Sequence, residues 1–256
     1  MIKIRSTQMK AFEEEALKRF EKEMFVHSKE FSPRLCEVLD DDQLRVALRQ
    51  AMSRANSYGF TNRGSVRLYI EMMFLYGSDF DTDPQYSSVG EILNSPDDQM
   101  QRAEQIYQGI LDYQKQVSGP NNINVKEALQ ALSLFALISV PIKDNNFEIE
   151  MIYELERAFP QKVADVGKER MTELIYEGRL EAQKYGFDTV RGEAMMVVLM
   201  FSFGHGCTDD PLYPWIYQTL KDCKIKDSAA RAKRLEKKAV TWLEHVLARL
   251  ELGGKI

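Results

Sequence analysis

The sequence predicts an all-α fold built from two related helical units, and three observations support this. Apolar residues recur at helical spacing along the chain, whereas sustained period-two alternation and Asn-Gly hairpin signals are lacking. The second half matches the first at a constant offset of 127 residues, so that Tyr58-Gly59-Phe60 aligns with Tyr185-Gly186-Phe187. Hydrophobic residues make up 44% of the 256 positions, with 14 glycines and 8 prolines, which is typical of a packed globular chain.

The first three helices are predicted from apolar stripes and their end signals. The first follows Thr7 and ends at Ser32-Pro33, with an inward stripe of Met9, Phe12, Ala16, Phe20, Met24 and His27. The second is capped within Asp40–Asp42 and closes at Gly59, with Leu44, Ala47, Leu48, Ala51 and Ala55 inward. Thr61 is expected to cap the third, which ends at Gly77 and buries Val66, Tyr69, Ile70, Met73 and Phe74.

The later helices have comparable signals. Ser95-Pro96-Asp97-Asp98 predicts a helix start, and Gly119-Pro120 marks its end. Residues 124–138 are apolar on most faces, which predicts a central helix. A last helix is expected over residues 228–252, ended by Gly253-Gly254, with a stripe of Ala232, Leu235, Ala239, Trp242, Leu243, Val246 and Leu250. We expect a first unit at 1–122 and a second at 123–256, packed as one body.

The repeat is the strongest organisational signal in the chain. Over residues 20–93, 16 of 74 positions are identical to the residue found 127 positions later, without a gap. The identities include Gly77 with Gly204, Asp83-Pro84 with Asp210-Pro211, and Tyr86 with Tyr213. This pattern predicts an internal duplication of a helical unit, with a long C-terminal helix added after the second copy.

The acidic string Asp79-Phe80-Asp81-Thr82-Asp83-Pro84 resembles a metal loop, but the repeat favours a structural role. Asp83-Pro84 is present in both copies, whereas Asp79 and Asp81 are replaced by Gly206 and Thr208. Asp83 and Asp210 are therefore expected to cap the short helices that follow, and Asp81 is expected to contribute little. A calcium loop starting at Asp79 would need glycine and glutamate where the chain has Pro84 and Gly90.

A second chemical candidate is the loop that holds His205 and Cys207. With Cys223 and His245 these residues suggest a zinc site or a hydrolase that uses the His205–Cys207 loop. The close paired spacing of a zinc ligand set is missing, and the alternative is buried thiols beside a surface imidazole. We predict no catalytic residue, no metal site and no cofactor.

The segment Leu212–Tyr217 is the candidate partner-binding site. Leu212, Pro214, Trp215 and Tyr217 replace Gln85, Ser87, Ser88 and Gly90 of the first copy, and Tyr213 matches Tyr86. Aromatic residues in place of polar ones indicate either burial under the C-terminal helix or a surface for a protein partner. If it is a surface, its contact residues are Leu212, Tyr213, Trp215 and Tyr217.

Charge and hydropathy narrow the class of partner. The net charge of −5 argues against nucleic-acid binding, because the basic surface of such proteins is missing. The most apolar run, at residues 192–206, is too short to span a bilayer, and the N-terminal residues lack a signal-peptide pattern. Three scattered cysteines suit reduced thiols, so we expect a cytoplasmic protein without membrane partners.

Two stretches of the first half resemble a known group of proteins. "QMKAFEEEALKRFEKEMFVHSKEFSP" and "AMSRANSYGFTNRGSVRLYIEMMFLYGSDFDTDP" are similar to all-helical accessory proteins of bacterial type VI secretion effector loci, most clearly over Gln8–Pro84. Such proteins tend to be encoded near spike-tip or toxin proteins. The resemblance implies an effector chaperone or loading adaptor and assigns no active-site residue.

These observations together predict a non-enzymatic protein-binding factor that serves a secreted effector. One alternative is a cytosolic immunity protein, which would cover the active site of a cognate toxin. The other is the metal-dependent hydrolase that would use the His205–Cys207 loop.

Overall fold

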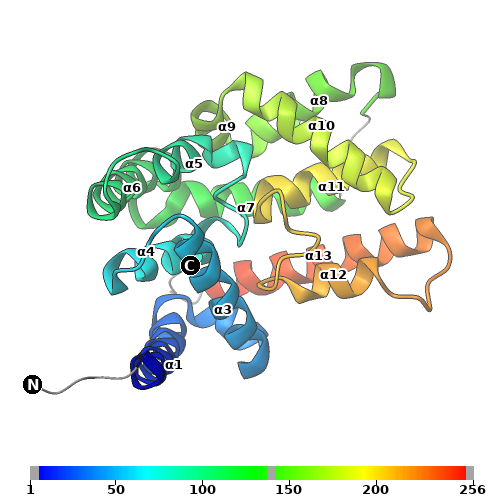
Figure 1. The fold of residues 1–256 in the computed structure, drawn as a ribbon. Coiled ribbons are helices and arrows are strands. Elements are labelled where there is room, and N and C mark those ends of the chain that lie inside the picture. The colour runs from blue at the N-terminus through cyan, green and yellow to red at the C-terminus, as the bar shows by residue number, and fades with distance from the viewer. Residues whose placement is uncertain (1–5, 138–141, 252–256) are drawn as a thin grey trace, which may run out of the picture.

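The computed structural model describes residues 6–137 and 142–251. In these ranges the chain consists of helices joined by turns and loops, with no strand, as the sequence predicts (Figure 1). The predicted end of the last helix at Gly253-Gly254 and the side chain of Leu250 lie outside the described part.

The first half begins with the longest helix and ends in a π-helical turn. Its elements are α1 (Ser6–Phe31), α2 (Pro33–Val38), α3 (Asp41–Ser57), α4 (Arg63–Tyr76), the 3-10 turn η1 (Pro84–Tyr86), α5 (Ser87–Leu93), α6 (Gln99–Tyr113) and the π-turn η2 (Gln114–Ser118).

The second half places α11 between α10 and α13 (Figure 1). Its elements follow the 3-10 turn η3 (Pro120–Asn122) and are α7 (Ile123–Leu137), η4 (Asp144–Asn146), α8 (Phe147–Ala158), α9 (Pro160–Val166), α10 (Lys168–Lys184), α11 (Val190–Phe203), α12 (Pro214–Leu220) and α13 (Ser228–Glu251).

Side-chain caps precede some of the helices, and two helices start later than the predicted signals. Asp40 caps α3 in a capping box with Gln43, as expected from the acidic triplet. The residue before α4 is Asn62 rather than Thr61, and α6 starts after Asp98 rather than Ser95. Asp98 accepts hydrogen bonds from two backbone N–H groups of the first turn, which explains why the helix begins there.

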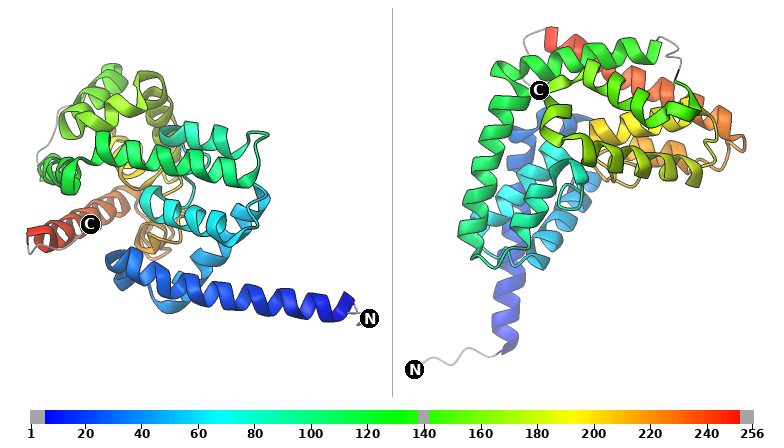
Figure 2. Two further views of the ribbon diagram at one scale, coloured as in Figure 1. Left: turned by 90° about the vertical axis from the view of Figure 1, so that its left-hand side faces the viewer. Right: turned by 90° about the horizontal axis from the view of Figure 1, so that it is seen from above.

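The apolar stripe of α1 is buried only in its C-terminal part. Phe20 and Met24 are 7% and 5% exposed, whereas Met9 and Phe12 are 51% and 65% exposed. Both views in Figure 2 show why: the N-terminal part of α1 projects beyond the rest of the molecule. The prediction that the whole stripe faces inward is therefore wrong for its first half.

Helix bounds in the two halves agree with the offset of 127. Helices α3 and α10 differ by 127 at both ends (168 − 41 and 184 − 57), and so do α4 and α11 (190 − 63 and 203 − 76). Gly77 and Gly204 end α4 and α11 with φ of 98° and 96°, values that favour glycine. The duplication itself stays a prediction, which these matching bounds support.

Two hydrophobic cores follow the two halves. One is built from α1 to α6 and takes in Leu212 from the second half, and the other runs from Val117 to Leu235. Tyr113 and Tyr213 pack against both cores. The division at residue 122 stays a prediction, but Leu212 shows that the second half completes the core of the first.

The halves meet through two reciprocal aspartates. Asp83 Oδ1 accepts from the Gln85 N–H at 2.8 Å, and its Oδ2 accepts from the His205 N–H at 2.7 Å. Asp210 does the same in reverse: it accepts from the Leu212 N–H and, at 2.8 Å, from the Ser78 N–H. Asp83 therefore caps η1, as predicted, whereas Asp210 closes the turn before α12, whose N-cap residue is Tyr213, so the prediction that Asp210 caps this helix is wrong. Each carboxylate also binds the loop of the other half.

The close approach at this junction depends on glycine. A Cβ atom at Gly77 would lie 2.5 Å from the Phe203 carbonyl oxygen, and one at Gly204 would lie 2.9 Å from the Tyr76 carbonyl oxygen. Both distances are too short for a side chain, so the paired glycines let the two loops touch.

A lysine is buried beside this junction. Lys162 of α9 is 5% exposed, and its Nζ donates to the Phe201 carbonyl oxygen at 2.5 Å. The Nζ atom lies 4.5 Å from the centre of the Phe201 ring and 5.6 Å from that of Tyr86 in η1. Burial lowers the pKa of this ammonium group to about 8, although Asp83 and Asp165 oppose the shift.

Candidate functional site

The predicted partner segment Leu212–Tyr217 lies mostly inside the molecule. Leu212 is 1% exposed, so it is a core residue and is not accessible to a partner. Tyr213 and Trp215 are partly buried against the core of the second half. Tyr217 is 45% exposed and is the only one of the four predicted contact residues that points largely to solvent.

Aromatic packing under α13 explains this burial. The Phe203 ring centre lies 4.6 Å from that of Tyr213, 5.9 Å from that of Trp215 and 4.7 Å from that of Trp242 in α13. Phe203 therefore links Trp215 of α12 to Trp242 of α13, and α12 packs against α13. Of the two alternatives for this segment, the geometry favours burial, and a partner contact at Tyr217 stays a prediction.

The acidic string is engaged in an internal ion-pair network. Arg54 of α3 pairs with both Asp79 and Asp81, and its Nη1 donates to the Ser78 carbonyl oxygen at 3.1 Å. The Tyr69 hydroxyl donates to Asp81 at 2.8 Å. Because the Asp81 carboxylate is buried and makes these bonds, the expectation that it contributes little is corrected: Asp81 holds the loop to α3 and α4.

His205 and Cys207 do not face each other as a catalytic pair would. The Nδ1 and Nε2 atoms of His205 contact Glu177 at 3.3 Å and Thr82 at 3.0 Å. Cys207 is fully buried, and burial raises the pKa of its thiol well above the usual range. Cys223 is exposed, and among the described residues no group of three His, Cys, Asp or Glu could hold a metal ion.

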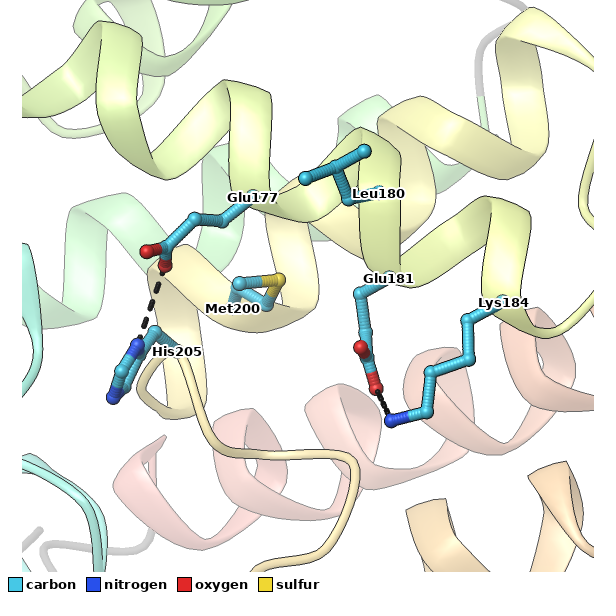
Figure 3. Close-up of a pocket in the computed structure, with 6 residues that line it drawn as sticks. All are labelled: Glu177, Leu180, Glu181, Lys184, Met200 and His205. Atoms are coloured by element: carbon cyan, nitrogen blue, oxygen red, sulfur yellow. Dashed lines mark hydrogen bonds and ion pairs between the residues drawn. The ribbon is translucent and has the colours of Figure 1, made fainter.

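A hollow of about 410 Å³ opens beside the His205 loop (Figure 3). Glu177 and Glu181 lie one turn apart on α10 and flank it, with Leu180 and Lys184 from the same helix and Met200 from α11. Glu181 accepts from Lys184 Nζ at 2.9 Å and from the Thr208 hydroxyl at 2.7 Å. The hollow thus combines two carboxylates with an apolar contribution from Leu180 and Met200.

Large apolar side chains are exposed on the two helices above this hollow. Ile149 and Tyr153 of α8 are 70% and 60% exposed, and Tyr176 and Leu180 of α10 are 64% and 48% exposed. The helices pack together, and Thr172 of α10 donates to Glu148 of α8 at 3.0 Å. We call these four exposed residues, which lie on two helices that pack together, the α8–α10 face, and its member Leu180 also lines the hollow.

The same positions in the first half are mostly polar. The residues 127 positions before Ile149, Tyr153, Tyr176 and Leu180 are Lys22, Val26, Arg49 and Ser53. Sequence analysis missed this face, although the comparison that singled out Leu212–Tyr217 applies to it equally. The signal was the replacement of a charged or polar residue by an apolar or aromatic one at a solvent-facing helix position.

No protein-family model, curated protein or solved structure matches the chain. The functional proposal therefore rests on the sequence and the structure. Within residues 6–137 and 142–251, none of the helices has both the length and the apolar character needed to cross a membrane.

Proposed function

We propose that the chain is a non-enzymatic protein-binding factor whose main contact surface is the α8–α10 face. The exposure of Ile149, Tyr153, Tyr176 and Leu180 is the observation that supports this most. Grouped large apolar side chains at a surface favour association, since their burial removes apolar area from water. Tyrosine is also enriched among residues that dominate binding energy, because its rigid ring loses little entropy on binding.

Several groups that sequence analysis weighed for chemistry make structural contacts, which agrees with a binding factor. Arg54, Asp79 and Asp81 form one internal network, and Asp83 and Asp210 join the two halves. The thiol of Cys207 is buried, and burial disfavours the thiolate that nucleophilic chemistry needs.

The particular role we propose is that of a chaperone or loading adaptor for a type VI secretion effector in the bacterial cytoplasm. It rests on the resemblance of Gln8–Pro84 to accessory proteins of such loci. A cytosolic immunity protein is the alternative, and the two differ in the part of the partner they bind. An adaptor binds the translocated or spike-linked part, whereas an immunity protein binds the toxin domain and protects cells from it.

Co-purification tests this proposal. The tagged chain is expressed with each effector or spike-tip protein encoded beside its gene, and retention of each is measured. The double variant Tyr153→Ser/Tyr176→Ser is expected to lose the partner, while Tyr107→Ser on α6, which alters a tyrosine that is 48% exposed, is expected to retain it. If both variants lose the partner, or if both retain it, the α8–α10 face is not the contact surface. Truncated partners then separate the adaptor from the immunity role.

A further inference from the structure

The predicted repeat relates the hollow beside the α8–α10 face to a set of residues in the first half. Counted back by 127 residues, its lining residues Glu181 and His205 correspond to Arg54 and Ser78. In the first half the Arg54 guanidinium bridges α3 and the loop after α4, because its Nη1 donates to the Ser78 carbonyl oxygen at 3.1 Å. The first half thus supplies its own arginine to bridge the helix and the loop.

The charges at these positions are rearranged in the second half. The loop residues that correspond to the arginine-binding Asp79 and Asp81 are Gly206 and Thr208. The carboxylates lie on the helix instead, at Glu181 and one turn earlier at Glu177. A guanidinium placed in the hollow would therefore meet carboxylates again, but it would have to come from another molecule.

The contacts of these glutamates leave room for such a ligand. Glu177 Oε2 contacts His205 Nδ1 at 3.3 Å, which is long for a charge-assisted hydrogen bond. Glu181 accepts from the Thr208 hydroxyl and is paired with Lys184, whose side chain is half exposed and can swing into solvent. The two carboxylates outnumber the one lysine ammonium at the hollow, so its lining favours a cation.

We infer that the hollow binds an arginine side chain of the protein partner. The guanidinium would bind Glu177 and Glu181, and its aliphatic stem would pack on Leu180 and Met200. A planar guanidinium offers five donors in a fixed arrangement, so it can bond both carboxylates, whereas a lysine ammonium acts as a compact, strongly hydrated charge. The inference rests on the proposed function, since Leu180 belongs to the α8–α10 face, and it adds the chemistry of the partner.

Methyl NMR on the whole chain tests the inference with small probes. The Met200 and Leu180 methyl signals are followed during titration with Nα-acetyl-L-arginine amide, and again with the neutral isostere Nα-acetyl-L-citrulline amide. We expect saturable shifts with the arginine compound and binding at least about tenfold weaker with citrulline, because charge-assisted hydrogen bonds are lost. Nα-acetyl-L-lysine amide is expected to bind more weakly than the arginine compound, and equal binding overturns the choice of arginine.

Matched variants locate the site. Glu177→Gln and Glu181→Gln are each expected to weaken arginine binding about tenfold or more, while Glu173→Gln, at an exposed position one turn before Glu177, is expected to leave it unchanged. Glu177 is partly exposed and its one described contact is His205, so this variant is expected to fold normally. The inference is overturned if the arginine compound causes no shifts or if the citrulline compound causes equal shifts. It is also overturned if neither glutamine variant changes the shifts. If partner capture still depends on Tyr153 and Tyr176 in that case, the proposed function stands without the arginine site.

Discussion

Replacing Lys162 by methionine should reveal how much the buried ammonium costs. Its pKa falls from an ordinary 10.5 to about 8 in the folded chain, mainly because burial penalises the charge. Below pH 8 both the folded and the unfolded chain hold the proton, and the full cost of the shift, about 3 kcal/mol, is present. Between pH 8 and 10.5 the unfolded chain binds more protons than the folded one, so rising pH relieves the cost.

The assay is chemical denaturation of the wild type and of Lys162→Met from pH 7 to pH 9.5. The unfolding free energy of the wild type should rise relative to that of Lys162→Met by about 2 kcal/mol over this range. The difference between the chains is the useful quantity, because burial also raises the pKa of Cys36, to about 11, and of Cys207, which lowers the stability of both chains as pH rises. A difference that stays constant with pH would refute the assignment of a depressed lysine pKa at the junction.

Three further substitutions test the internal architecture by thermal or chemical unfolding. Asp81→Ala should destabilise the chain by about 3 kcal/mol, because Arg54 loses a buried partner. Asp209→Ala, at an exposed position, should be near neutral, and equal effects of the two substitutions would contradict the ion-pair network. Asp210→Ala should cost about 1–3 kcal/mol, since the Ser78 and Leu212 N–H groups lose their acceptor, and an unchanged midpoint would refute the reciprocal junction. Trp215→Ala should cost about 3 kcal/mol if its packing on Phe203 is structural, and undiminished stability with lost partner binding would restore the interface alternative.

The periodic core of the fold could be predicted from the sequence. The inward residues predicted for α3 and α4, from Leu44 to Phe74, are all buried, since a helix that packs on one side must keep its apolar residues at helical spacing. The same argument failed for Met9 and Phe12. Periodicity identifies an amphipathic helix, but it does not indicate how far along that helix the packing against the rest of the molecule extends. It failed for caps where several capping residues follow one another, as at Ser95 and Asp98.

The junction and the acidic network could be predicted only in part. The helix-cap prediction, which concerns local structure, holds for Asp83 and not for Asp210. The bonds of these residues to His205 and Ser78 join positions more than 120 residues apart, which local signals do not indicate. Asp81 was judged dispensable because the second copy has Thr208 in its place. Its partner Arg54 is also replaced in the second copy, by Glu181, so both members of the ion pair differ there. The replacement of Asp81 taken alone therefore does not show that Asp81 is dispensable in the first copy.

Site-specific photo-crosslinking in intact cells of the native host tests the central claim most directly. A photoreactive phenylalanine analogue is placed at Tyr153 or Tyr176 on the α8–α10 face, or at Tyr107 on α6 as the control, and crosslinked proteins are identified by mass. If the α8–α10 face binds the partner, one effector or spike-tip protein should be captured from Tyr153 and Tyr176 and not from Tyr107. Capture of that protein from Tyr107 alone, or from none of the three positions while it still co-purifies with the chain, would contradict the claim.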